Sequence, residues 1–351
     1  MGSDPIVLQT SMHDNRIEPP DDGTARQPKA VRVEIRQLSH LSKVIRALGT
    51  GGWIFRGHAS SDWPLSSSLE REFLVAPKAG GHNQQVAAPE FGKSDECYAI
   101  ELFKRLSQGK MVPQTHEVEW LAAMQHYGTH TRLVDFTRSI YVALYFAFEN
   151  RQATTTRAIY AIRFKDLIHN DTIRNDLISV LAEDLDKSGD AKGPAYERRM
   201  MFIKKSYYKN QLELQQTLVR LADEVIRCGS RGEGVIPVHV PGANDRLVAQ
   251  SGLFLLPRSF SSFESNLALS LGLSAQEIRN PGEVVTDPLK SGVTTKLRAA
   301  SFIKLVFDRN RLPEHAVWNM LDQANVSAQS LFPGLEGIAK SIRYGEPLFA
   351  T

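Results

Sequence analysis

QHYGTHTRLVDFTRSIYVALYFAF, residues 125–148, runs from a polar segment into a segment that is apolar almost all round. A helix that is hydrophobic on every side belongs in the interior of a domain or in a membrane. A membrane span needs about 20 apolar residues, and the apolar run 141–148 is far shorter. The sequence therefore predicts a buried helix at the centre of the core.

The polar residues before this helix allow two interpretations. Thr137 or Ser139 would cap the helix with a hydroxyl, and the same position offers free helix N–H groups to an anion. Arg132 and Asp135 form either a structural ion pair or part of a binding site. Residue types alone leave both interpretations open.

A second stretch, GGWIFRGHASSDWPLSSSLER at 51–71, places Trp53, Ile54 and Phe55 directly before Arg56 and Gly57. The three apolar residues predict a buried strand that ends at the arginine. A guanidinium presents a planar fork of donors that suits phosphate groups, and a glycine permits close approach of a backbone. The alternative is an arginine that ends a strand and pairs with a carboxylate.

A third stretch, RLVAQSGLFLL at 246–256, brings Arg246 and Gln250 to the start of an apolar strand. A polar side chain on a buried strand costs free energy unless it finds partners. Gln250 either faces a site or bridges neighbouring backbone groups.

Strand patterns and helix patterns are interleaved along the chain without a regular repeat, which predicts an α+β fold. Strands are expected at 31–35, 157–164, 235–240, 252–256 and 302–307, and helices at 94–107 and 117–127. Residues 1–29 have the composition of a disordered lead-in. Residues 30–351 are expected to form one domain with a helical insertion at about 171–229.

Composition narrows the class of protein. Of 351 residues, 42% are hydrophobic and 23% charged, with a net charge of +3, as in ordinary globular proteins. Cys97 and Cys228 are far apart and fit no paired-cysteine metal motif. The start lacks a signal-peptide layout, and no histidine cluster or phosphate-binding glycine motif occurs. We therefore expect a cytoplasmic protein without a metal or a membrane partner.

The three stretches, taken in order, resemble the FRG domain family. The resemblance rests on Phe55-Arg56-Gly57, on QHYGTHTRLVDFTRSIYVALYFA, on RLVAQSGLF and on the closing LFPGLEG, and it runs from about 33 to 344. The order is also similar to ADP-ribosyltransferases of the arginine–serine–glutamate class. These have a strand with Arg-Gly, a strand ending in Ser-Thr-Ser before an apolar helix, and a strand bearing the catalytic glutamate. The resemblance implies a split-sheet core of that kind, with flanking helices.

The same resemblance implies roles in binding NAD as a substrate. Arg56, with Gly57 beside it, would grip the diphosphate, and Thr137 and Ser139 would hold the nicotinamide end. Gln250 stands where the class has its glutamate, so Asp135 is the alternative acid. The residues expected to contact NAD are Arg56, Gly57, His126, Tyr127, Arg132, Thr137, Ser139 and Arg246.

The implied function is that of an intracellular effector of the toxin or phage-defence kind, which modifies a nucleic acid or a protein and has a neutralising partner. The alternative is a nucleotide- or nucleic-acid-binding module without catalysis, and a weaker one is a nuclease. A basic run with interleaved tyrosines is either a nucleic-acid contact or a solvated helix face. It comprises Arg198, Arg199, Lys204, Lys205 and Lys209.

Overall fold

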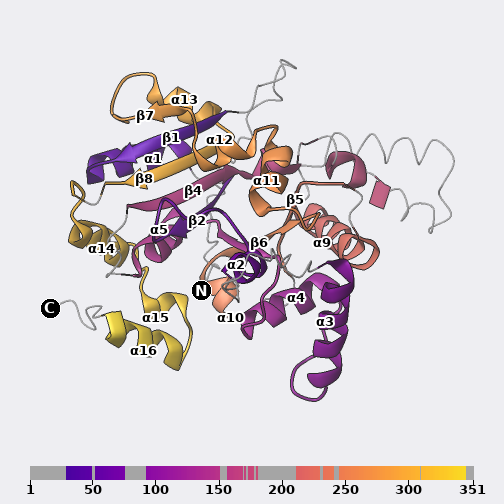
Figure 1. The fold of residues 1–351 in the computed structure, drawn as a ribbon. Helices are drawn as coiled ribbons and strands as arrows, with labels where there is room; N and C mark the ends of the chain where they lie inside the picture. The colour runs from indigo at the N-terminus through magenta and orange to yellow at the C-terminus, as the bar shows by residue number, and fades with distance from the viewer. Residues whose placement is uncertain are drawn as a thin grey trace, which may run out of the picture.

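The computed structural model describes residues 29–49, 52–75, 92–150, 156–168, 170, 173–177, 179–180, 211–229, 232–240, 245–308 and 310–344. Within these ranges, eight strands form one mixed sheet in the order β5-β6-β3-β2-β4-β8-β1-β7 (Figure 1). β1 pairs in parallel with β7 and β8, and the other neighbours pair antiparallel. The predicted α+β class is confirmed.

The strands that were predicted begin and end close to their expected positions, with one difference that matters for the site, whereas β7 was not predicted. The strand with Arg56 does not end there but continues to His58, because Arg56 and Gly57 pair with Tyr160 and Ile159 of the next strand. The strands are β1 Ala30–Ile35, β2 Trp53–His58, β3 Val134–Thr137, β4 Arg157–Arg163, β5 Val235–Val238, β6 Gly252–Pro257, β7 Glu283–Val285 and β8 Phe302–Phe307.

Helices cover both faces of the sheet. They are α1 Leu38–Leu48, α2 Ser68–Val75, α3 Lys93–Leu106, α4 Glu117–His126, α5 Ile140–Phe148, α6 Phe164–Ile168, α9 Gln211–Cys228, α10 Asp245–Ala249, α11 Phe263–Leu271, α12 Ala275–Arg279, α13 Val293–Ala299, α14 Glu314–Gln323, α15 Ala328–Leu331 and α16 Leu335–Tyr344. α6, α11 and α12 pack on one face. On the other face, α1, α5, α13, α14 and α15 cover β2 to β7, whereas α3, α4 and α9 cover β5 and β6.

The part of the predicted helical insertion that the structure describes is helical and packed. Leu214, Leu218, Leu221 and Val225 of α9 are buried against α4 and β5, so they form one apolar stripe along the helix. Gly229 follows the helix with a φ of 82°, the left-handed conformation common after a helix end. Within the described residues, no helix is long and apolar enough to span a membrane.

Two neighbouring strands inside the sheet, β2 and β3, barely pair. β2 and β3 are joined by the single residue pair Phe55–Thr137, whereas β2 and β4 pair along six residues from Trp53 to His58. The three strands β5, β6 and β3 and the five strands β2, β4, β8, β1 and β7 therefore meet at a narrow junction. We call this junction the sheet opening.

The buried helix α5 crosses β2 at Gly57. A Cβ atom at Gly57 would lie 2.0 Å from the carbonyl oxygen of Ala143 and 2.7 Å from the backbone nitrogen of Ala147. Such distances are far inside van der Waals contact, so any side chain here displaces the helix. The close approach anticipated for Gly57 is thus made by the α5 backbone.

Replacing Gly57 with alanine should therefore destabilise the fold. We expect Gly57→Ala to lower the free energy of unfolding by about 2 kcal/mol or more, because forcing atoms into a packed core costs about 1–3 kcal/mol even when neighbours adjust. Urea unfolding followed by circular dichroism measures the change.

Gly282→Ala is the matched control, because a Cβ there has no atom within 4 Å. We expect it to change the free energy of unfolding by less than about 1 kcal/mol. Equal stability of the two variants would contradict the packing of α5 on Gly57.

Candidate functional site

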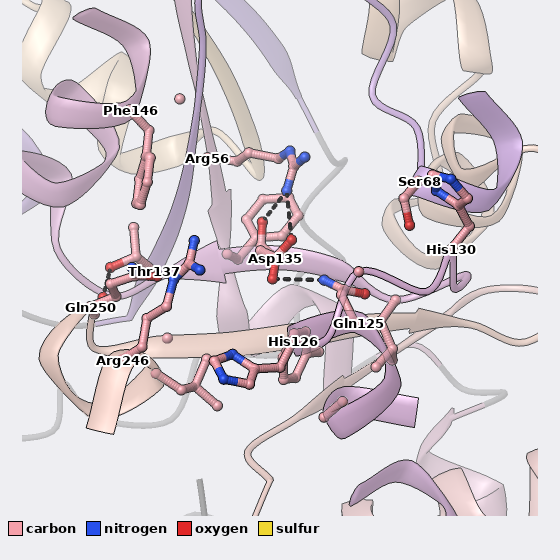
Figure 2. A pocket seen from close by; sticks show the side chains of 18 of the residues that line it. Arg56, Ser68, Gln125, His126, His130, Asp135, Thr137, Phe146, Arg246 and Gln250 are labelled. Carbon is pink, nitrogen blue, oxygen red and sulfur yellow. Dashed lines mark hydrogen bonds and ion pairs between the residues drawn. The ribbon is translucent and has the colours of Figure 1, made fainter. Parts of the chain in front are cut away.

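A cavity of about 1610 Å³ lies at the sheet opening (Figure 2). On one face of the sheet it is bounded by α5 on one side and by α4 on the other, since these helices belong to separate core clusters. Its lining combines polar, charged and apolar side chains. The lining residues used below are Arg56, Gly57, His58, Trp63, Ser66, Ser68, Arg71, Glu119, Gln125, His126, Tyr127, His130, Asp135, Thr137, Phe146, Arg246, Gln250 and Arg343.

Arg56 spans the sheet opening. Side chains alternate along a strand, so Phe55 and Gly57 face α5 and Arg56 is directed away from it. Its Nη1 nevertheless reaches the backbone oxygen of Asp135 on β3 at 2.6 Å, and lies 3.7 Å from the carboxylate oxygen Oδ2. The side chain is 17% exposed. The guanidinium thus holds the two halves of the sheet together at the point where backbone pairing stops.

His58 holds the other end of the same guanidinium. Arg56 Nε donates to His58 Nε2 at 3.1 Å. Burial, with the charges of Arg56 and then Arg71, lowers the pKa of His58 to about 3. The ring is therefore neutral at physiological pH and keeps a lone pair for the arginine. Burial also lowers the pKa of Arg56, and the charge of Asp135 opposes that shift.

Asp135 presents its carboxylate to the cavity. Its side chain is 59% exposed, and Oδ1 accepts a hydrogen bond of 2.8 Å from Gln125 Nε2 at the end of α4. The amide oxygen of Gln125 accepts in turn from the hydroxyl of Thr131. Figure 2 shows the carboxylate between Arg56 and Gln125. The carboxylate is thus fixed in place while it remains open to a ligand.

The two hydroxyls before α5 are largely engaged with the chain itself. Thr137 lines the cavity, and its hydroxyl donates to the backbone oxygen of Gln250 at 2.7 Å and accepts from the Ser139 amide at 3.0 Å. The Ser139 hydroxyl caps α5 by accepting from the Val142 amide, and Ser139 does not line the cavity. For Ser139 the structure thus shows the capping interpretation.

Gln250 lies in the turn between α10 and β6, ahead of the strand rather than on it. It lines the cavity, but its amide nitrogen donates to the backbone oxygen of Leu331 at 3.1 Å. Gln250 thus lines the cavity and also bonds a backbone group of the chain, so features of both interpretations are present.

Arg132 lies outside the cavity that it was expected to line. Its side chain is 4% exposed and makes two 2.8 Å hydrogen bonds to the Glu96 carboxylate. It also donates to the backbone oxygen of Pro257. An ion pair of Arg132 with Asp135, one of the two interpretations left open by the sequence, is not formed; the pairs are Arg132–Glu96 and Arg56–Asp135. Burial raises the pKa of Glu96, and the charge of Arg132 opposes that shift.

The other predicted contact residues do reach the cavity. Gly57, His126, Tyr127 and Arg246 all line it. Arg246 lies 4.7 Å above the ring of Phe332 and 3.7 Å from Glu336. The basic run from Arg198 to Lys209 falls outside the described residues. In the described ranges, no group of three or more histidine, cysteine or acidic side chains is placed to hold a metal ion.

Sequence reasoning missed His58 and Gln125, which orient the two charged groups. His58 stands two residues after Arg56, so once β2 is known to continue, strand alternation puts both side chains on one face. No comparable signal pointed to Gln125, because its contact with Asp135 depends on where α4 packs.

The neutral state of His58 predicts a pH dependence of stability. The unfolded chain takes up a proton near pH 6.5, whereas the folded protein resists protonation down to about pH 3. The free energy of unfolding should therefore fall as the pH drops below 6.5, by up to about 1.4 kcal/mol per pH unit from this residue.

Urea unfolding at pH 7 and pH 5 measures this slope, and His58→Gln is the comparison because glutamine does not titrate. We expect the difference between the two pH values to be smaller in the variant. The same difference in both proteins would show that His58 takes up its proton at the same pH in the folded protein as in the unfolded chain, which would contradict the lowered pKa.

Comparison with models of protein families matches residues 51–156 to the FRG domain. No curated protein matches the chain, and no solved structure matches it either. The matched range holds β2, β3 and α5, and with them Arg56 and Asp135. That the domain extends over 30–351 stays a prediction. Residues 51–156 of this chain are an FRG domain.

Proposed function

We propose that the cavity binds NAD and that the protein transfers ADP-ribose from it to a macromolecule, with release of nicotinamide. The proposal rests mainly on one observation: at the sheet opening, the guanidinium of Arg56 lies beside the exposed carboxylate of Asp135. The three stretches that resemble the transferase motifs lie on or next to the neighbouring strands β2, β3 and β6. This neighbourhood supports an ADP-ribosyltransferase-like arrangement.

Arg56 is the group proposed to hold the diphosphate. Its hydrogen bonds to the described part of the chain use Nε and Nη1, so Nη2 is left for a ligand. A guanidinium pairs with phosphate through short, charge-assisted hydrogen bonds. Because His58 and the Asp135 carbonyl fix the plane of the fork, little side-chain freedom would be lost on binding.

Asp135 is the group proposed to stabilise the transition state. Departure of nicotinamide leaves positive charge on the ribose, as in glycoside cleavage, and a nearby carboxylate favours that charge. Gln250 carries no charge, and its amide is bonded to Leu331. Of the two candidates, the structure therefore favours Asp135.

The size of the cavity also supports a large ligand. Pockets for small molecules usually measure about 300–1,000 Å³, whereas this one measures about 1610 Å³. The excess leaves room for a dinucleotide together with part of an acceptor. Phe146 from α5 lies at the edge of this space and offers an apolar wall to an aromatic ring (Figure 2).

The proposal predicts that NAD consumption depends on the fork at position 56. We expect Arg56→Ala to lower the rate by at least about tenfold, since it removes charge-assisted hydrogen bonds. Arg56→Lys should retain part of the rate, because it keeps the charge without the planar fork. Release of nicotinamide from NAD, followed by chromatography, measures both.

Arg105→Ala on α3 is the control, because Arg105 is exposed and does not line the cavity. A wild-type protein that binds NAD but releases no nicotinamide with any acceptor would support the non-catalytic nucleotide-binding alternative. Full activity in Arg56→Ala would contradict the site.

A second prediction separates the two candidates for the acid. Asp135→Asn keeps the size of the side chain and removes its charge, so we expect the rate to fall by about 10²–10³-fold, as for the loss of one transition-state donor. Gln250→Ala should cost less than about tenfold. A larger loss in Gln250→Ala than in Asp135→Asn would move the role to position 250.

A further inference from the structure

The cavity has two sides, which meet at the contact between Arg56 and Asp135 (Figure 2). One side holds Phe146, Thr137, Gln250 and Arg246, and the other holds Ser68 and His130. The second side is where α2 approaches the segment before β3, since the Leu69 amide donates to the backbone oxygen of Thr131. We call this second side the α2 side.

We propose that the α2 side binds a single-stranded nucleic acid as the acceptor of ADP-ribose. The inference rests on the proposed function and names the substrate class of the same site. NAD then occupies the side with Thr137 and Arg246, and Arg56 lies between the two ligands.

Exposed aromatic rings are the first observation. Trp63 and Tyr127 line the cavity and are 55% and 68% exposed. The backbone of Trp63 is held by the Tyr160 hydroxyl, which donates to its carbonyl oxygen at 3.1 Å. Large aromatic rings left open at a cavity are typical platforms for unpaired bases, because every base has a face that stacks.

Cationic side chains that line the same cavity are the second observation. Arg71, one turn along α2 from Ser68, donates from Nη1 to the backbone oxygen of Ser66 at 2.8 Å, which holds the guanidinium at the cavity. Its charge contributes to the lowered pKa values of both Arg56 and His58. Two cations close together without a shared carboxylate favour a polyanion such as a phosphate backbone.

Two acids near this side have partners within the chain. Glu119 lines the cavity, but its Oε2 accepts 2.8 Å hydrogen bonds from the Thr115 and His116 amides. Glu72 on α2 is 3.4 Å from His130. Asp135 and Glu72 remain 59% and 62% exposed. It is the two guanidiniums together with the open aromatic rings that favour an anionic, base-bearing acceptor over a basic protein segment.

The proposed transfer of ADP-ribose needs no reactant other than NAD and the acceptor. The bond between C1′ of the ribose and the nicotinamide nitrogen breaks, and its electron pair leaves with nicotinamide. A nitrogen or oxygen nucleophile of the acceptor forms a new bond to C1′. The proton that the nucleophile loses passes to Asp135 or to solvent.

Binding is tested first, without NAD. Fluorescence anisotropy with a labelled single-stranded oligonucleotide should show binding that weakens with salt, and Trp63→Ala should reduce the affinity at least tenfold. Tyr98→Ala on α3 is the control, because Tyr98 is likewise an exposed aromatic residue, at 68%, and does not line the cavity. Unchanged binding in Trp63→Ala, or equal losses in both variants, would overturn the inference.

Transfer is tested with the full chain, labelled NAD, the oligonucleotide and a nuclease-treated protein extract in the same reaction. We expect label on the oligonucleotide, and we expect the ratio of transferred to hydrolysed ADP-ribose to fall at least tenfold in Trp63→Ala. Label confined to protein would overturn the inference and leave the proposed function standing. Oligonucleotide binding without any loss of nicotinamide would overturn the proposed function instead.

Discussion

The pairing of Arg56 with the backbone of Asp135 is the interaction on which the centre of this molecule depends. The two parts of the sheet share one residue pair at β2 and β3. A strand edge normally satisfies its carbonyl groups with a neighbouring strand, and here a side chain supplies the donor. The same guanidinium faces the cavity, so one group both closes the sheet and defines the site. Its orientation depends on a neutral histidine, which burial maintains.

The cavity exists because the helices over one face of the sheet belong to two separate clusters. α5 packs with α1, α13 and α14, and α4 packs with α3 and α9. β3 runs between the two groups, and its polar residues Asp135 and Thr137 lie on the uncovered face. On the opposite face the core is continuous from β5 to β8. The cavity thus results from the division of the covering helices into two groups. The sheet beneath it is continuous except at the sheet opening.

Much of this arrangement was predictable from the sequence. The buried helix, the strands at 252–257 and 302–307 and the leucine stripe of α9 follow from hydrophobic periodicity, a local property of the chain. The order of the strands and the partner of Arg132 were not predictable in this way. Glu96 lies 36 positions from Arg132, and nothing local distinguishes it from other acids. A serine before a helix is suited both to capping the helix and to contacting a ligand. For Ser139 only the structure distinguishes these roles, because Ser139 caps α5 and does not line the cavity.

The tripeptide Phe55-Arg56-Gly57 combines two residues that pack in the core with one that faces the cavity. The outer two residues face α5, where the ring fills the core and the glycine leaves room for the helix backbone. Only the middle residue turns toward the opening of the sheet. No amino acid is smaller than glycine, so every coding change at position 57 adds atoms where none fit. A change at position 56 instead removes the hydrogen bonds to Asp135 and His58 and leaves the contact between Gly57 and α5 in place. In a related chain, a phenylalanine and a glycine at these two outer positions would indicate that the packing of α5 on β2 is retained. The residue between them would indicate whether the anion-binding arginine is retained.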